Sequence, residues 1–283
     1  KYPRPPNNSR VSYWLGSACF QLLDYAQSHS HLEDQVERYP EEQPYYDHAL
    51  LLKAMVEENL SDWAAARRSY GEVLSRESAR ELWPESLYRR GGIDLRRADY
   101  ADALTAFTRI LVEFPDSAYA DEAVFFLGEC QFFVGRYPEA ERSFRSVLET
   151  DPAPEQLETG LYRLALITSE LGRKQEALEF CTELQRLFPR SRFVEPLARL
   201  EADLLFDLSR YAEAYDAYRQ ALATAGEAQE RQVIYYNMGL SAYLDGDLRR
   251  SVEPLEQALQ GRSGIAERSL FRLAAAQAAI DAE

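Results

Sequence analysis

The sequence predicts an all-α protein built as a solenoid of antiparallel helix pairs. The first observation is a repeat of constant length: equivalent positions recur every 37 residues, at Trp63, Tyr100, Tyr137, Lys174, Tyr211 and Leu248. The second is that apolar residues inside each copy recur at three- and four-residue spacing, which is the period of a helix. The third is a shortage of the β-branched residues valine and isoleucine, which disfavours sheet. Self-similarity at this period is typical of stacked repeats.

Two kinds of column support helix pairs. Nine residues before the aligned position, every copy has a small residue: Ala54, Gly91, Gly128, Ala165, Ala202 and Gly239. Seven residues after it, every copy has a residue that can fill a core: Tyr70, Phe107, Phe144, Cys181, Tyr218 and Leu255. A small residue lets two helices approach closely, and the large side chain fills the space beside it. The two columns therefore predict one helix before the aligned position and a second helix after it.

Turn residues separate the two helices. Gly135, Gly172 and Gly246 lie two residues before the aligned position, where the first helix must stop and the chain must reverse. Prolines at 115, 152 and 189 lie 15 residues after the aligned position, where the second helix should end. One such pair cannot bury both of its faces, so it stacks on the next pair.

The elements follow in order along the chain. Residues 1–10, "KYPRPPNNSR", are predicted as an extended tail, interpreted either as a tether after a cleaved signal or a lipidated cysteine, or as an arbitrary boundary. Residues 11–283 are predicted as one solenoid: a divergent capping pair at 11–44, six 37-residue repeats at 45–262 and a terminal helix at 263–283. That helix is the first half of a seventh repeat without its partner. We therefore expect Leu270 and Phe271 to be partly exposed and the helix to offer a surface for homo-oligomerisation.

Charge narrows the range of partners. The formal net charge is −15, which disfavours nucleic acid as a ligand because phosphate binding needs a basic surface. The charge is uneven: residues 21–62 carry a net −8, whereas residues 63–111 carry a net +2. The acidic stretch is interpreted as a solvated end of the solenoid, or alternatively as a patch that attracts a basic partner.

Few residues suggest chemistry. Cys19, Cys130 and Cys181 fall on packing positions of the repeat, have no CxxC spacing, and are predicted to be apolar core residues. The segment "SHSHLED" places His29 and His31 beside two acids and is interpreted as a polar turn between helices rather than a metal site. No nucleophile elbow and no phosphate-binding glycine loop is present. We therefore predict a non-enzymatic protein with no catalytic residues, metal or cofactor.

The order of small, aromatic, alanine, large apolar and proline positions resembles the tetratricopeptide repeat over residues 45–262, best in "LGECQFFVGRYPEAERSFRSVLETDP". The resemblance implies a right-handed superhelix. The chain departs from the family pattern at Gln131, Asp94 and Thr168, where an aromatic is usual, and at Lys174 and Cys181; its period is also three residues longer. The linker sequences in 114–144 and 188–206 resemble those of bacterial envelope proteins of this family, namely the lipoprotein of the outer-membrane barrel-assembly machine and the periplasmic coordinator of the Tol-Pal system.

The resemblance also implies a concave inner wall. On the family pattern, the residues three before and one, four and five after the small position of each first helix face inward. The inward positions are rich in aromatic and charged residues, and those predicted to bind a partner are Tyr88, Arg96, Phe125, Glu129, Phe132, Phe133, Tyr162, Arg199, Asp203, Phe206, Tyr236 and Tyr243. Rigid aromatics give contact area at low entropy cost, the arginines suit a carboxylate, and the acids suit basic groups.

Three functional hypotheses follow. The first is a scaffold in a bacterial cell envelope, periplasmic or anchored to the outer membrane, that binds a peptide or a protein partner in the groove. The second is a cytoplasmic adaptor or the regulatory arm of a larger protein. The third is a periplasmic protein associated with a transporter. No stretch approaches the roughly 20 apolar residues of a membrane span, so any anchoring is expected through a lipid upstream of Lys1.

Overall fold

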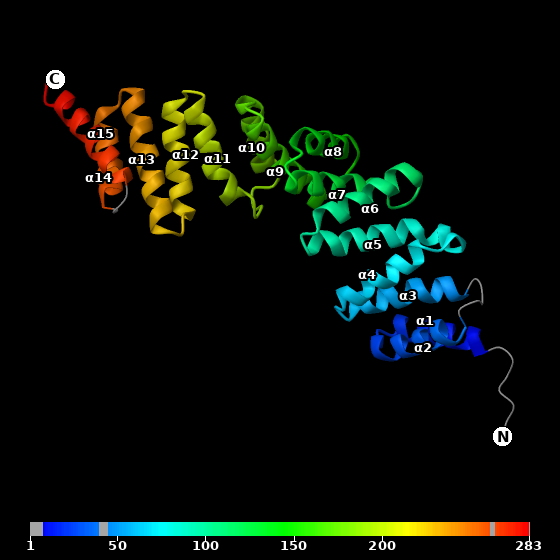
Figure 1. Ribbon diagram of the computed structural model, residues 1–283. Coiled ribbons are helices and arrows are strands. Elements are labelled where there is room, and N and C mark those ends of the chain that lie inside the picture. The colour runs from blue at the N-terminus through cyan, green and yellow to red at the C-terminus, as the bar shows by residue number, and fades with distance from the viewer. Residues whose placement is uncertain (1–7, 40–44, 261–263, 283) are drawn as a thin grey trace. The chain divides into compact units, whose positions relative to one another are not determined.

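The computed structural model describes residues 8–39, 45–260 and 264–282, and in these ranges it contains fifteen α-helices, one short 3₁₀ helix and no strand (Figure 1). The prediction of an all-α chain is confirmed. Residues 1–7 of the predicted tail, residues 40–44 of the capping pair, and positions 261–263 and 283 lie outside the described residues.

The chain divides into two compact units, Lys1–Ser146 and Val147–Glu283. The first unit contains α1 (Asn8–Gln21), α2 (Tyr25–Arg38), α3 (Tyr45–Asn59), α4 (Trp63–Leu74), η1 (Glu77–Leu82), α5 (Trp83–Arg96), α6 (Tyr100–Glu113), α7 (Ala120–Phe133) and most of α8 (Tyr137–Glu149). The second contains α9 (Pro154–Glu170), α10 (Lys174–Leu187), α11 (Val194–Asp207), α12 (Tyr211–Thr224), α13 (Ala228–Asp245), α14 (Leu248–Leu259) and α15 (Gly264–Ile280). The prediction of a single solenoid over 11–283 stays a prediction.

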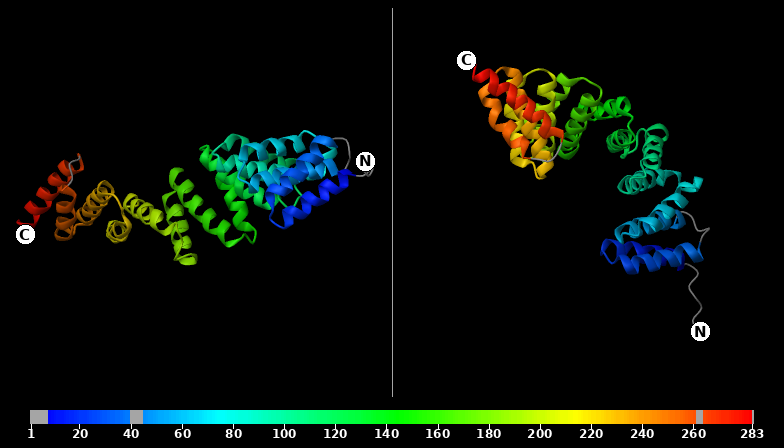
Figure 2. Two further views of the ribbon diagram at one scale, coloured as in Figure 1. Left: turned by 90° about the horizontal axis from the view of Figure 1, so that it is seen from below. Right: turned by 60° about the vertical axis from the view of Figure 1, so that its left-hand side comes forward.

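Within each unit the helices pack in chain order (Figures 1 and 2). Each helix contacts the next one along the chain, for example α3 with α4 and α4 with α5, or α11 with α12 and α12 with α13. The first helices of neighbouring pairs also touch: α1 with α3, α5 with α7, and α13 with α15. These contacts are those of stacked helix pairs, so the predicted repeat architecture is present in both units.

The register of the repeat is fixed at the turn inside each pair. The second helices α4, α6, α8, α10, α12 and α14 all begin at the aligned residue. Five first helices end at the matching positions Asn59, Arg96, Phe133, Glu170 and Asp207, which are again 37 residues apart. The starts of the first helices and the ends of the second helices vary by a few residues, so length differences are absorbed in the linkers between pairs.

A left-handed residue forms each of these turns. Gly135 has φ 76°, Gly172 has φ 75° and Gly246 has φ 86°, as their positions predict. Non-glycine residues adopt the same conformation in the other copies, with φ between 59° and 62° at Leu23, Ser61, Ala98 and Ser209. In the turn after α7, the amide of Gly135 donates to the Phe132 carbonyl at 3.0 Å and that of Arg136 donates to the Gln131 carbonyl at 2.8 Å. This is the Schellman arrangement that ends a helix and reverses the chain.

The small and large columns meet in the core of each pair, as predicted. A Cβ added to Gly91 would lie 2.8 Å from the ring of Phe107, and one added to Gly239 would lie 2.7 Å from Leu255. The N-terminal pair keeps the same rule, since a Cβ on Gly16 would lie 2.6 Å from Leu32. The capping pair is therefore a true copy of the repeat whose turn lies 38 residues, rather than 37, before the next one.

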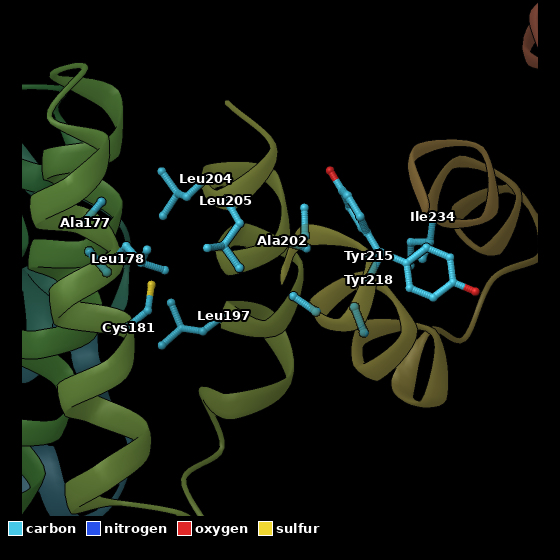
Figure 3. Packing of buried hydrophobic residues seen from close by; sticks show 14 of the residues in the cluster. Ala177, Leu178, Cys181, Leu197, Ala202, Leu204, Leu205, Tyr215, Tyr218 and Ile234 are labelled. Atoms are coloured by element: carbon cyan, nitrogen blue, oxygen red, sulfur yellow. The ribbon is translucent and has the colours of Figure 1, made fainter. Parts of the chain in front are cut away.

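The core consists of such contacts repeated along each unit. Figure 3 shows the example between α10 and α11, where Leu178 and Cys181 point toward Leu197 and Leu205. Cys130 and Cys181 are fully buried, which confirms their prediction as core residues, and burial raises the pKa of each thiol to about 12. None of the described helices has both the length and the apolar composition needed to span a membrane.

Three local predictions need correction. Helix α1 begins at Asn8, so residues 8–10 are helical rather than extended; the last proline of the tail is Pro6, and no helix breaker follows it. The segment with His29 and His31 lies inside α2, because Asp24 caps that helix by accepting the Gln27 amide at 3.1 Å. The linker after α4 contains the unpredicted helix η1.

The C-terminal helix is helical as predicted. α15 buries Ala276, which follows the small position Gly239 by one repeat, and leaves Leu270 and Phe271 exposed. At the other end, Val11, Trp14 and Leu15 of α1 are also exposed, which was not predicted.

The turn geometry predicts the effect of glycine substitution. Ala98→Gly should raise stability by about 0.5–1 kcal/mol, because a left-handed L-residue costs roughly 1–2 kcal/mol and the greater freedom of glycine in the unfolded chain offsets part of the gain. Gly135→Ala should lower stability by a similar amount. Thermal unfolding followed by circular dichroism measures both; a lower Tm for Ala98→Gly would contradict the role assigned to the turn.

Candidate protein-binding face

The structure places all twelve predicted partner-binding residues on the first helices of their pairs. Tyr88 and Arg96 lie on α5, Phe125, Glu129, Phe132 and Phe133 on α7, Tyr162 on α9, Arg199, Asp203 and Phe206 on α11, and Tyr236 and Tyr243 on α13. The residues on α5 and α7 belong to the first unit, and the others belong to the second. Phe125 is buried in the core against Phe126 and Phe144, whereas the other eleven are partly or well exposed.

The position three before the small residue contacts the following pair. The ring of Tyr88 lies 5.0 Å from that of Tyr119, and Tyr162 stacks on Phe193 at 4.2 Å with an interplanar angle of 9°. In the next copy the same two positions form an ion pair, with the Arg199 guanidinium 3.9 Å from Glu230. The partner is always 31 residues later in the chain. These side chains therefore connect neighbouring pairs, a contribution that the sequence did not reveal.

The position five after the small residue contacts the preceding pair. The Arg96 guanidinium lies 4.8 Å from the centre of the Trp63 ring. Two further pairs have the same 33-residue separation: Tyr100 stacks on Phe133 at 4.6 Å and 8°, and the Lys174 ammonium lies 2.7 Å from Asp207. The departure from the family pattern at Lys174 is thereby explained, because an ion pair replaces aromatic stacking when both partners change.

Polar inward residues also have partners inside the chain. Glu58 accepts the hydroxyl of Tyr70 at 2.8 Å and pairs with Arg96 at 3.1 Å. Asp203 accepts the hydroxyl of Tyr218 at 2.5 Å and lies 3.8 Å from Arg199. Desolvation by burial raises the pKa of Asp203, and burial followed by the neighbouring carboxylate raises the pKa of Tyr218. Both predicted carboxylate-binding arginines thus already contact acids of their own chain.

The column that departs from the family aromatic is a buried polar column. Glu57 accepts from Ser69 at 2.7 Å and Gln131 accepts from Ser143 at 2.8 Å, in both cases 12 residues apart. Asp94 instead accepts from Arg67 at 2.5 Å, a side chain of the preceding pair. Buried polar groups need such partners, and a serine 12 residues on was the sequence signal that could have predicted two of them.

The largest aromatic surface is a ladder of four rings at the turn end of the first unit. It runs from Tyr100 to Phe133 at 4.6 Å, from Phe133 to Phe132 at 5.6 Å, and from Phe132 to Tyr137 at 5.7 Å. Phe133 is 44% exposed and the adjoining Val134 is 40% exposed. Tyr100 and Tyr137 were not among the predicted site residues, although they are the aligned positions that define the repeat. In the second unit Phe206 and Tyr211 form the equivalent pair at 5.4 Å.

The described residues hold no gathering of three or more His, Cys, Asp or Glu side chains of the kind that binds a metal ion. His29 contacts Glu57 at 3.3 Å and Glu33 at 3.9 Å, and Glu57 is also bound by Lys53 at 2.6 Å. This cluster links α2, α3 and α4 through the buried Glu57. It is consistent with a structural part for these side chains.

Comparisons with known proteins agree with this geometry. A family model described as a tetratricopeptide repeat-like domain matches residues 85–239, and a second one, described as a tetratricopeptide repeat, matches residues 51–118. A search of the curated proteins finds no significant match.

Solved structures show the same fold at low sequence identity. A tetratricopeptide repeat protein from Parabacteroides merdae is 17% identical, with a TM-score of 0.55 over 95% of this chain and 98% of that one. MamA from Desulfovibrio magneticus RS-1 is 16% identical, with a TM-score of 0.54 over 67% of this chain and 99% of that one. YrrB, described as a TPR protein with an unusual peptide-binding site, is 15% identical, with a TM-score of 0.53 over 68% and 91% of the two chains.

The stacking of neighbouring pairs can be tested by a double-mutant cycle. Tyr100→Leu and Phe133→Leu should show a coupling of about 0.5–1.5 kcal/mol in urea-unfolding free energies, because their rings stack directly. Tyr100→Leu combined with Val112→Ala serves as the control, since Val112 is exposed on α6 and contacts neither ring in the cycle. Additive effects in both cycles would show that the stacked pair does not connect the repeats.

Proposed function

The chain is a member of the tetratricopeptide repeat family, and on that premise we propose that it is a non-enzymatic scaffold which binds a peptide or an exposed segment of a partner protein. The inner face of the first helices is the proposed binding surface. The partner contacts side chains that remain accessible after the pairs have stacked on one another.

The aromatic ladder is the observation that supports this proposal. Tyr100, Phe133, Phe132 and Tyr137 form a contiguous, partly exposed apolar surface held by ring contacts on three helices. Aromatic side chains with few rotatable bonds bind a ligand with little loss of conformational entropy. Because the rings already contact one another in the free protein, the surface is organised before a partner arrives.

The charged inward residues are assigned to orientation rather than to affinity. Arg96, Arg199 and Asp203 each contact a charged or hydroxyl group of the chain itself. A ligand that bound them would have to replace those contacts. Their exchangeable pairs suit a ligand with charges of both signs. The peptide-binding site named for YrrB is a precedent for this use of the fold.

We also propose a bacterial cell envelope as the location, with a lipid anchor upstream of Lys1. The linkers in 114–144 and 188–206 support this location through their resemblance to envelope members of the family. Fractionation of cells that express the full-length gene tests it. Recovery with the cytoplasmic fraction would favour the alternative of a cytoplasmic adaptor.

Two aromatic residues should carry much of the partner binding. Phe132→Ala with Phe206→Ala should reduce capture of partner proteins from a lysate of the source organism by at least ten-fold, because each loses the larger part of a buried aromatic contact, about 2 kcal/mol at an interface. Affinity capture with quantitative mass spectrometry, compared with the unchanged protein, measures the loss.

The control is Val112→Ala, which removes an equally accessible apolar side chain from the second helix α6, away from the inner face. Circular dichroism should show unchanged helicity in all variants. If the Phe132 and Phe206 variant captures the same proteins in the same amounts as the control, the inner face is not the binding surface.

A further inference from the structure

A pocket of about 370 Å³ lies between α4 and α5, outside the inner-face residues discussed above. It is lined by four arginines and two small residues, namely Arg67, Arg68, Arg90, Arg97, Ala64 and Gly71. All of them belong to the first unit. A cluster of four guanidinium groups is notable in a chain whose formal net charge is −15.

The repeat itself shows what these positions normally hold. In the column of Arg67 the other copies have Leu104, Glu141, Leu178, Tyr215 and Val252. In the column of Arg90 they have Lys53, Leu127, Leu164, Glu201 and Met238, and in that of Arg97 they have Leu60, Val134, Leu171, Leu208 and Asp245. Most are apolar, and none is arginine. The junction between α4 and α5 therefore replaces apolar packing with arginine in three columns at once.

The chain does not fully neutralise these arginines. Arg67 is well paired, since its guanidinium lies 2.5 Å from Asp94 and 2.5 Å from Asp102. Arg90 reaches Asp94 only at 3.9 Å, and Arg97 pairs at 3.1 Å with Asp99 on the surface.

The fourth arginine has no internal counter-charge. Arg68 forms no ion pair or hydrogen bond within the part of the chain that the structure describes. Arg68, Arg90 and Arg97 consequently keep donors that can be directed at a ligand.

Gly71 is a second, independent observation at the same place. It lies inside α4, where glycine costs roughly 0.5–1 kcal/mol relative to alanine. A Cβ on Gly71 would meet only the Nη1 atom of Arg90, at 3.6 Å, which is an ordinary contact. Gly91, by contrast, is required by the ring of Phe107. Helix packing does not require a glycine at 71, and its effect is to keep the pocket floor open beside Arg90.

We propose that this pocket binds an oxyanion group, a carboxylate or a phosphate, carried on a short acidic segment of a partner protein. Guanidinium groups match the planar or tetrahedral oxygens of such groups with paired hydrogen bonds. A short segment is favoured over nucleic acid because a long polyanion would extend from the pocket over a surface that is acidic as a whole. The ligand here is acidic and the site lies apart from the aromatic ladder, so the proposal goes beyond the function proposed above.

Fluorescence anisotropy with defined probes tests this assignment. The probes are a labelled peptide with a run of glutamates, the same peptide with one phosphoserine, and a labelled oligothymidylate of 12 nucleotides, with inorganic phosphate as a competitor. Arg68→Gln combined with Arg90→Gln should weaken binding of both peptides at least ten-fold. The charge-matched control, Arg142→Gln with Arg219→Gln, removes two exposed arginines elsewhere and should leave the affinity unchanged.

A third variant blocks the pocket without changing its charge. Gly71→Leu places a side chain into the open floor and should also weaken peptide binding at least ten-fold, while circular dichroism confirms that α4 still folds. Phe132→Ala with Phe206→Ala should keep full affinity, which separates this site from the inner face.

The two supporting outcomes differ in ligand. Tighter binding of the phosphoserine peptide, with competition by inorganic phosphate, identifies a phosphate site; equal binding of the glutamate peptide identifies a carboxylate site. The proposal is overturned if neither peptide binds, if the pocket variants bind as well as the charge-matched control, or if the oligothymidylate binds more tightly than the peptides.

Discussion

The turn between the two helices of each pair is the constraint on which the rest of the structure depends. One residue with positive φ and two backbone hydrogen bonds end the first helix and start the second at a fixed distance. Because both helices are held in register by the same few atoms, the small residue of the first always meets the large residue 16 positions later. Length differences are confined to the linkers, where no such bond pattern operates.

Features that repeat could be predicted from the sequence, since each copy is evidence for the others. Gly135 and Gly172 revealed the turn, and the structure shows Ala98 and Ser209 in the same conformation although neither residue would indicate it alone. Features that occur once were missed: the start of α1, the helical setting of His29 and the helix η1 have no second copy to compare. Local propensity had to decide those cases, and at chain ends and linkers it is a weak guide.

The candidate site shows a different limit. The alignment placed the inward residues on the correct helices, but it could not say that Tyr88 contacts a residue 31 positions later or that Phe133 contacts one 33 positions earlier. Those partners lie in other repeats, so single columns do not reveal them. Comparing pairs of columns does, because Lys174 and Asp207 differ together from Tyr100 and Phe133. The inner face is therefore partly occupied by contacts that hold neighbouring pairs together.

This distinction offers a physical criterion for function in a repeat protein. A residue that departs from its column and has an internal partner is explained by stability: Lys174 has Asp207, and Asp94 has Arg67. A residue that departs without such a partner lacks that explanation. Gly71 departs from a column of larger residues with no helix pressed against it, and the adjoining arginines replace apolar residues without full compensation. Selection for folding alone would have restored leucine and alanine there, so the exception itself indicates a ligand.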